Sequence, residues 1–177
     1  STKRGAGPND TEVLATQVAR LAENARSRQN RQKDKACEIL EQRIIENDLL
    51  QNKILILEIY ERDDIPQTLT GLIATYFINK YNRPALVVRK NKAGFLRGSA
   101  RSSETFAIPN GFKHFLFYSG LMEYAEGHDN AFGVSFPSKH QDALVAYANE
   151  NLREEMLTTN TYTVDYIFDG SENFSEL

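Results

Sequence analysis

The sequence has very little of several residue types that mark common protein classes. It contains one cysteine, no tryptophan and three histidines in 177 residues. The single cysteine, Cys37, excludes an internal disulfide and a site built from several thiolates, so we interpret it as an ordinary helix residue and expect a reducing compartment. No apolar run approaches the roughly 20 residues of a membrane-spanning helix, and the first residues lack the apolar core of a signal peptide. We therefore expect a cytoplasmic protein with no membrane partner.

The patterns of several enzyme classes are also missing. A two-metal phosphodiesterase site needs several converging carboxylates and histidines, and the three histidines have no closely spaced Asp/His pattern. Asp63-Asp64 is the paired-carboxylate candidate in the body of the sequence, but beside Ile65-Pro66 it is more typical of a loop. We find no P-loop, no dinucleotide-binding glycine pattern and no nucleophile with its base. The sequence predicts no metal site and no catalytic residue in this chain.

The composition is that of a folded domain, but the charge is unevenly distributed. Hydrophobic residues make up 41% and charged residues 25% of the sequence. Residues 1–45 carry a net charge of +3, residues 46–149 are neutral overall, and residues 150–177 carry −6. Within the neutral middle, residues 80–101 contain seven Lys or Arg and no Asp or Glu. We call this segment the basic island, because such local density favours contact with a phosphate backbone.

The N-terminal part of the chain has the periodicity of one long helix, from about residue 11 to residue 50, with Asp10 or Thr11 as the cap. Apolar residues recur at helical spacing on both sides of residues 26–35, a stretch that contains no apolar residue. That stretch is either a solvated helix between two packed bodies or a helix that faces an anionic ligand. A solvated face is the more common case.

The middle of the chain alternates between strand and helix patterns. Residues 54–60 and 85–88 are typical of buried strands, and residues 69–78 between them have helical spacing, so we predict a βαβ unit with parallel strands. A turn at residues 91–94 leads into an antiparallel strand, Phe95–Arg101. The sequence therefore predicts an α/β fold in which a mixed β-sheet is flanked by helices and preceded by a long N-terminal helix.

The C-terminal part predicts shorter elements. Asn110 can cap a short helix, a glycine-containing bend around Gly120 leads to Glu126-Gly127-His128, and residues 131–136 have a strand pattern. Ser138 opens a further helix with capping-box spacing, and residues 161–168 are rich in β-branched and aromatic side chains, which favours a last strand. We divide the chain into a linking helical segment (1–51), a central domain (52–157) and a C-terminal strand with an acidic tail (158–177).

Two polar segments are candidate sites for an anionic ligand. Residues 98–103, Gly-Ser-Ala-Arg-Ser-Ser, combine a glycine, three hydroxyls and an arginine beside the basic island, and these groups can bind phosphate oxygens. Gly127-His128 places a histidine among small residues that leave room for a ligand. Each segment also has a structural explanation, as a strand end with a solvated arginine and as a structural histidine. We assign no role to His114 and His140.

Four short motifs together resemble a known family. They are residues 70–74 (Thr-Gly-Leu-Ile-Ala), 81–88 (Tyr-Asn-Arg-Pro-Ala-Leu-Val-Val), 98–102 (Gly-Ser-Ala-Arg-Ser), and Gly127-His128 with Ala131 and Gly133. Their order and spacing are similar to the C-terminal half of RecJ-type single-strand DNA exonucleases of the DHH phosphoesterase superfamily. Residues 20 to 150 look like the DHH-associated domain of that family, preceded by much of the helix that joins it to the catalytic domain.

The resemblance implies a two-part enzyme. An N-terminal DHH domain holds Mn²⁺ or Mg²⁺ and cuts single-stranded DNA, while the DHH-associated domain, here residues 52–157, grips the substrate. The residues implied at the substrate phosphates are Gly98, Ser99, Arg101, Ser102, Gly127 and His128. The DHH motif and its companion aspartates do not occur in these 177 residues. We therefore expect the catalytic domain to be another part of the protein or a partner chain, and this chain to be inactive alone.

Two residues depart from the family pattern. Glu126 stands where the Gly-Gly-His motif has its first glycine, which places a carboxylate beside the expected phosphate site. Phe132 stands where the second alanine of an Ala-Ala-Gly motif is usual. Both departures weaken the comparison for His128 more than for Arg101.

The resemblance also gives a meaning to the charged helical stretch, because Arg26, Arg28 and Arg31 are then predicted to face the cleft between the two domains.

Three functions stay open. The favoured one is the substrate-gripping part of a 5′→3′ single-strand DNA exonuclease. The second is the substrate-binding domain of a phosphodiesterase for short oligonucleotides or cyclic dinucleotides. The third is a non-catalytic interaction module that recruits a partner through residues 150–177.

Overall fold

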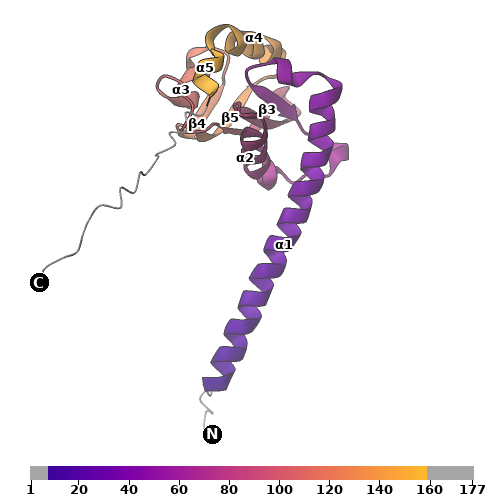
Figure 1. Ribbon diagram of the computed structural model, residues 1–177. Coiled ribbons are helices and arrows are strands. Elements are labelled where there is room, and N and C mark those ends of the chain that lie inside the picture. Colours follow the sequence, from indigo (N-terminus) through magenta and orange to yellow (C-terminus); the bar gives the residue numbers. More distant parts are fainter. Residues whose placement is uncertain (1–7, 159–177) are drawn as a thin grey trace, which may run out of the picture.

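The computed structural model describes residues 8–158 and has the predicted α/β architecture (Figure 1). Helix α1 (Pro8–Glu46) has 39 residues and is about 58 Å long at 1.5 Å per residue. Its C-terminal part packs against the rest of the chain, and the remainder extends away from it (Figure 1). The other elements are β1 (Leu55–Glu58), α2 (Thr70–Tyr81), β2 (Ala85–Lys90), β3 (Phe95–Arg101), α3 (Gly111–Tyr118), β4 (Tyr124–His128), β5 (Ala131–Pro137), α4 (Gln141–Asn151) and α5 (Glu154–Leu157).

The five strands form one mixed sheet in the order β1-β2-β3-β5-β4. Strands β1 and β2 are parallel, as predicted for the βαβ unit, and the other pairs are antiparallel. The turn predicted between β2 and β3 is present, and Gly94 adopts φ 86° there, a conformation that favours glycine. The prediction of a mixed sheet is confirmed.

Helices cover both faces of this sheet. On one face, Phe132 of β5 lies beside Phe112 of α3 with ring centroids 5.8 Å apart, and Phe115 of α3 lies 4.9 Å from the ring of Tyr147 in α4. On the other face, Ser99 of β3 shares a 2.8 Å hydrogen bond with Thr70 at the start of α2. Coverage on both sides explains why β1 and β2 are almost continuously apolar rather than alternating.

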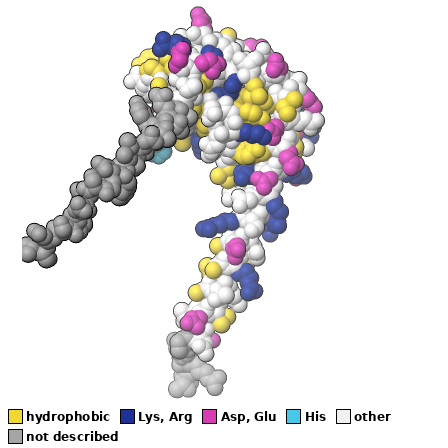
Figure 2. Space-filling model, viewed as in Figure 1, with side chains coloured by type: hydrophobic (Ala, Val, Ile, Leu, Met, Phe, Trp, Pro, Cys, Tyr) yellow, Lys and Arg dark blue, Asp and Glu magenta, His cyan; other side chains and the backbone are white. Residues whose placement is uncertain are grey.

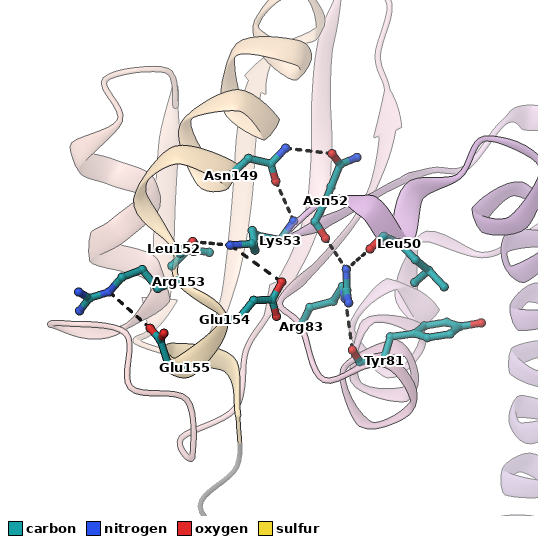
Figure 3. Close-up of polar contacts among 10 residues, drawn as sticks. All are labelled: Leu50, Asn52, Lys53, Tyr81, Arg83, Asn149, Leu152, Arg153, Glu154 and Glu155. Carbon is teal, nitrogen blue, oxygen red and sulfur yellow. Dashed lines mark hydrogen bonds and ion pairs between the residues drawn. The ribbon is translucent and has the colours of Figure 1, made fainter.

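A network of polar contacts joins the segment before β1 to the C-terminal end of α4 (Figure 3). The backbone N–H of Lys53 donates to Oδ1 of Asn149 at 2.8 Å, and the Lys53 ammonium donates to the carbonyl of Leu152 at 2.9 Å. The guanidinium of Arg83 donates to the carbonyls of Leu50 and Asn52. These bonds satisfy main-chain carbonyls at the entrance to β1 and fix the C-terminal end of α4 beside it.

The structure adds one strand and corrects two predictions. Residues 124–128, for which no strand was predicted, form strand β4, because their backbone pairs with β5 from Tyr124 opposite Ser135 to His128 opposite Ala131. The capping box at Ser138 is absent, because residues 138–140 form a 3₁₀ turn and α4 starts only at Gln141. Asn110 precedes α3 but makes no side-chain capping bond.

Some predictions fall outside the described part of the chain. The strand predicted at 161–168 and the acidic tail predicted to follow it lie beyond residue 158. Within residues 8–158, no helix combines the length and the apolar character that crossing a membrane requires. Cys37 lies in α1 and is buried, and this burial raises the pKa of its thiol to about 11. The thiol is therefore protonated at neutral pH, as expected for an ordinary helix residue.

Candidate functional site

The register of the sheet places Arg101 and His128 in one row. Arg101, the last residue of β3, is opposite Ala131 of β5, and Ala131 is opposite His128 of β4. Neighbouring strands are about 4.8 Å apart, so the two residues are about 10 Å apart across the sheet. Because only the methyl group of Ala131 stands between them, the floor between the two longer side chains stays open.

This row borders an open cavity of about 850 Å³. Residues from three parts of the fold line it: Thr75 and Asn79 on the exposed side of α2, residues 101–105 after β3, and residues 128–131 around the β4–β5 turn. The lining is mostly polar. The fold thus gathers three of the predicted site residues, Arg101, Ser102 and His128, around one space.

Arg101 is a cation without a carboxylate partner among residues 8–158. Its guanidinium lies over Gly71 so closely that a side chain at position 71 would overlap it, and Nη1 donates to the carbonyl of Ala100 at 2.9 Å. No carboxylate within residues 8–158 forms an ion pair with it. Burial lowers the pKa of Arg101, although an arginine stays charged at neutral pH. A partly desolvated and uncompensated positive charge favours an anionic ligand.

Ser102 supplies a second unused polar group. Its backbone N–H donates to the carbonyl of Asn130 at 2.9 Å, which joins the end of β3 to the β4–β5 turn. Its Oγ is buried and has no hydrogen-bond partner among the described residues. A buried hydroxyl without a partner costs free energy, and Ser102 is one of the residues that line the cavity. Because Oγ has almost no exposed surface, a rotation of the side chain is needed to bring this hydroxyl to a ligand oxygen.

His128 is exposed at the end of β4. Next to it, Asp129 is held by Lys113 of α3, with 3.5 Å between Nζ and the carboxylate, and Lys113 also donates to the carbonyl of Gly127 at 2.6 Å. Within residues 8–158, no hydrogen bond uses the His128 imidazole. Lys113 partly compensates the carboxylate of Asp129 at the cavity rim, and the histidine is left for a ligand.

Three of the predicted site residues do not line the cavity. Gly98 is pressed against the main chain of β2, where a Cβ would lie 2.8 Å from Cα of Val88. The Ser99 hydroxyl is engaged with Thr70. Gly127 has φ 133° and a Cβ there would lie 2.9 Å from Cα of Phe132. These three residues shape the strands that carry the site, and Glu126 is also outside the cavity lining.

The basic island is not one surface. Lys80 pairs with a carboxylate of α1, and Arg97 lies 3.5 Å from the carboxylate of Glu123. Arg83 and Arg89 donate to main-chain carbonyls. Four of the seven cations are therefore used to hold the fold together, and Arg101 is the member of the island that reaches the cavity.

Arg26, Arg28 and Arg31 lie on the exposed part of α1, where Lys and Arg side chains project from the helix (Figure 2). At about 100° per residue, Arg28 and Arg31 share one side of the helix, whereas Arg26 is about 140–160° away from them. The three side chains therefore do not present one face. Their prediction as DNA-facing residues stays a prediction.

The sequence did not indicate every polar residue at the cavity. Thr75 and Asn79 are one helical turn apart on the exposed side of α2, and Asn130 is in the β4–β5 turn. The i,i+4 polar pair was the available signal, because an amphipathic helix places such a pair on one side. No group of three or more His, Cys, Asp or Glu side chains in the described residues is arranged to hold a metal ion. The described part of the chain therefore does not fit a metal site.

Comparisons with known proteins agree with the motifs. No protein-family model matches the chain. The chain is 29% identical over 167 residues to YorK, named as a single-strand DNA-specific exonuclease of the SPbeta prophage in Bacillus subtilis strain 168, and equally to yorK of Bacillus phage SPbeta. These alignments cover 93% of this chain but 28% of either relative. The chain thus spans little more than a quarter of the length of the curated relatives it matches.

Two solved structures have a similar fold. The exonuclease RecJ bound to manganese matches with a TM-score of 0.52 and 19% identity, over 80% of this chain and 32% of that one. RecJ from Thermus thermophilus in complex with Mg²⁺ matches with a TM-score of 0.51 and 18% identity, over 82% of this chain and 21% of that one. The chain is thus related to RecJ-like single-strand DNA-specific exonucleases, and it has the fold of a part of RecJ.

Proposed function

We propose that this chain is the part of a RecJ-like 5′→3′ exonuclease that grips single-stranded DNA. Residues 52–157 correspond to the DHH-associated domain and residues 1–51 to the helical segment that links it to a DHH catalytic domain outside this sequence. That domain, in the same or a partner chain, holds Mn²⁺ or Mg²⁺ and hydrolyses the phosphodiester bond. The 29% identity to YorK and the RecJ-like fold support this proposal.

The observation that carries the proposal is that Arg101 and Ser102, two residues with incompletely partnered polar groups, line the same open cavity. The guanidinium of Arg101 has no carboxylate partner in the described chain, and the hydroxyl of Ser102 has no hydrogen-bond partner there. The planar fork of an arginine matches two oxygens of a phosphate, and a serine hydroxyl donates to a third. A DNA phosphate satisfies both groups at once.

The other residues of the row adjust this grip. His128 donates to the phosphate from the opposite side, and Ala131 leaves the floor between them open. Glu104 and Asp129 also line the cavity and repel a phosphate, although Lys113 compensates Asp129. Attraction and repulsion together give a moderate affinity, which suits a strand that advances after each cut.

Arg101→Ala tests the proposal directly. In a titration of a fluorescent single-stranded oligonucleotide, we expect the variant to bind about 10- to 100-fold more weakly, because a hydrogen bond to a charged group contributes about 1.5–3 kcal/mol. Arg153→Ala is the matched control, since this exposed arginine immediately precedes α5 and does not line the cavity. Equal affinity of wild type and Arg101→Ala would contradict the proposal.

Two further readings of the same titration separate the alternative functions. Affinity for long strands that exceeds affinity for dinucleotides supports an exonuclease, because a strand binder gains contacts with length. No gain with length would favour a phosphodiesterase for short oligonucleotides or cyclic dinucleotides.

We expect no cleavage by this chain in Mn²⁺, and cleavage abolished by a chelator would contradict the assignment of catalysis to another domain. Absence of any binding would favour an interaction module.

A further inference from the structure

A second cavity, of about 240 Å³, lies between α3, α4 and α5, and its lining is partly aromatic, with His114, Phe115, Tyr118 and Tyr147. His114 and Tyr118 are one helical turn apart on α3 with ring centroids 4.5 Å apart. Phe115 lies 4.9 Å from Tyr147 of α4. Tyr118 is 70% exposed. A large aromatic ring left this open at the mouth of a cavity offers a flat face to a ligand.

The same cavity contains polar groups that the fold does not use. The Nδ1 atom of His114 is buried and has no hydrogen-bond partner among the described residues. The side chain of Asn110 takes part in none of the hydrogen bonds found within residues 8–158. Asn151 donates through Nδ2 to the carbonyl of Tyr147 at 2.8 Å, which leaves its Oδ1 as an acceptor. Aromatic faces beside free amide and imidazole groups are the chemistry that recognises a nucleobase, by stacking and by hydrogen bonds to its edge.

The aromatic cavity adjoins the phosphate cavity through α3. The backbone N–H of Lys113 donates to the carbonyl of Asp129 at 2.9 Å, and a Cβ on Gly111 would lie 2.9 Å from Cβ of Asp129. Asp129 lines the phosphate cavity. Asn110, which precedes Gly111, and His114, which follows Lys113, line the aromatic cavity. The first turn of α3 therefore separates the two cavities, and a helix with its side chains is about 10 Å across.

We propose that the aromatic cavity of α3 and α4 binds a nucleobase of the strand whose phosphate lies at Arg101 and Ser102. Tyr118 stacks on the base, and His114 Nδ1 and Asn110 bind its edge. This inference rests on the proposed function, since it takes the occupant of the neighbouring cavity to be a DNA phosphate. It adds a contact that every base can make, because each has a face that stacks, so the grip stays independent of sequence.

The test compares two single-stranded oligonucleotides of equal length, one with normal bases and one in which the bases are replaced by abasic sites. We expect Tyr118→Ala to bind the normal strand about 5- to 100-fold more weakly, as for the loss of a stacked base, and the abasic strand with unchanged affinity. Tyr118→Phe keeps the ring and should bind like wild type. Phe117→Ala is the matched control, because Phe117 is 63% exposed on the same helix but does not line the cavity.

Fluorescence of 2-aminopurine in the strand gives a second readout, since stacking quenches it. Quenching by wild type that is lost in Tyr118→Ala supports the inference. An equal loss of affinity for both strands in Tyr118→Ala, or no loss for either, would overturn it. Arg101→Ala, measured in parallel, should weaken both strands. If it does so while Tyr118→Ala has no effect, the base site fails and the proposed function stands; if neither variant weakens binding, both fail.

Discussion

The two ends of helix α1 have the same apolar spacing and opposite surroundings. In its N-terminal part, Val18 and Leu21 follow the helical period but are 58% and 68% exposed. In its C-terminal part, Leu40 and Ile44 follow the same period and are fully buried. The difference comes from what lies beside each part, because only the C-terminal part meets α2 and β1. Spacing therefore predicts which side of a helix is apolar, but not whether another element covers it.

Charged residues show the same contrast. Arg43, near the end of α1, forms a two-pronged ion pair with Asp63, with 2.7 Å between Nη1 and Oδ2, and also donates to the carbonyl of Glu58 at 3.0 Å. Glu41 binds Lys80 of α2. Arg28, by comparison, projects from the exposed part of the helix. The packed end thus contributes to stability, and the exposed end is available for a partner.

The largest effect that separates the two ends is expected from apolar truncation. Ile44→Ala removes buried methyl and methylene groups and should lower the free energy of unfolding by about 2–5 kcal/mol. Leu21→Ala removes exposed groups and should change it by less than about 0.5 kcal/mol. Urea unfolding of both variants measures the difference. Similar losses in the two variants would show that the N-terminal part is covered in solution.

A smaller loss is expected from the ion pair. Arg43→Ala leaves the nearly buried carboxylate of Asp63 without its partner and should cost about 1.5–3 kcal/mol, whereas Arg28→Ala should cost almost nothing. The guanidinium of Arg43 holds the pKa of Asp63 below its ordinary value of 3.8. The ion pair therefore stabilises the fold above about pH 4, and this contribution disappears as the pH falls through the lowered pKa.

Unfolding at pH 7 and pH 3 checks the sign of this pH dependence. The difference in stability between wild type and Arg43→Ala should be largest at pH 7 and should shrink at pH 3. A difference that grows on acidification would contradict the assigned role of Asp63. Arg28→Ala is the matched control, and its difference from wild type should be small at both pH values.

The smallest effect concerns the arginines of the exposed part. Replacing Arg26, Arg28 and Arg31 with alanine should leave the unfolding temperature unchanged and weaken binding of single-stranded DNA. Because Arg28 and Arg31 share one side of the helix, the double variant should account for more of the loss than Arg26→Ala alone. Unchanged DNA affinity in the triple variant would remove these residues from the interface.

Much of the fold could be predicted because local signals agreed with one another. The βαβ unit, the hairpin and the long helix each had a clear period and clear turn residues. Strand β4 escaped prediction because it is an exposed edge strand, and residues 124–128 have neither a continuous apolar run nor a clean alternation. Its strand conformation depends on pairing with β5, and a pairing between segments is invisible to a local pattern.

The site was predictable in part for a related reason. Residue types marked Arg101, Ser102 and His128 as candidates, and the register of the sheet then brings them to one cavity. Gly98 and Gly127 looked like ligand-contact glycines, but close main-chain packing accounts for both. The basic island suggested one positive surface, yet ion pairs and main-chain carbonyls occupy most of it. The groups that these cations bind are determined by tertiary contacts, which cannot be predicted from composition.

The salt dependence of DNA binding tests the central claim most directly. We propose that Arg101 neutralises one phosphate of a single strand in the cavity that it shares with Ser102 and His128. Binding constants of wild type and Arg101→Ala, measured over a series of salt concentrations, should give log–log slopes that differ by about 0.7, the value for one phosphate of a single strand. Parallel slopes for the two proteins would contradict the account.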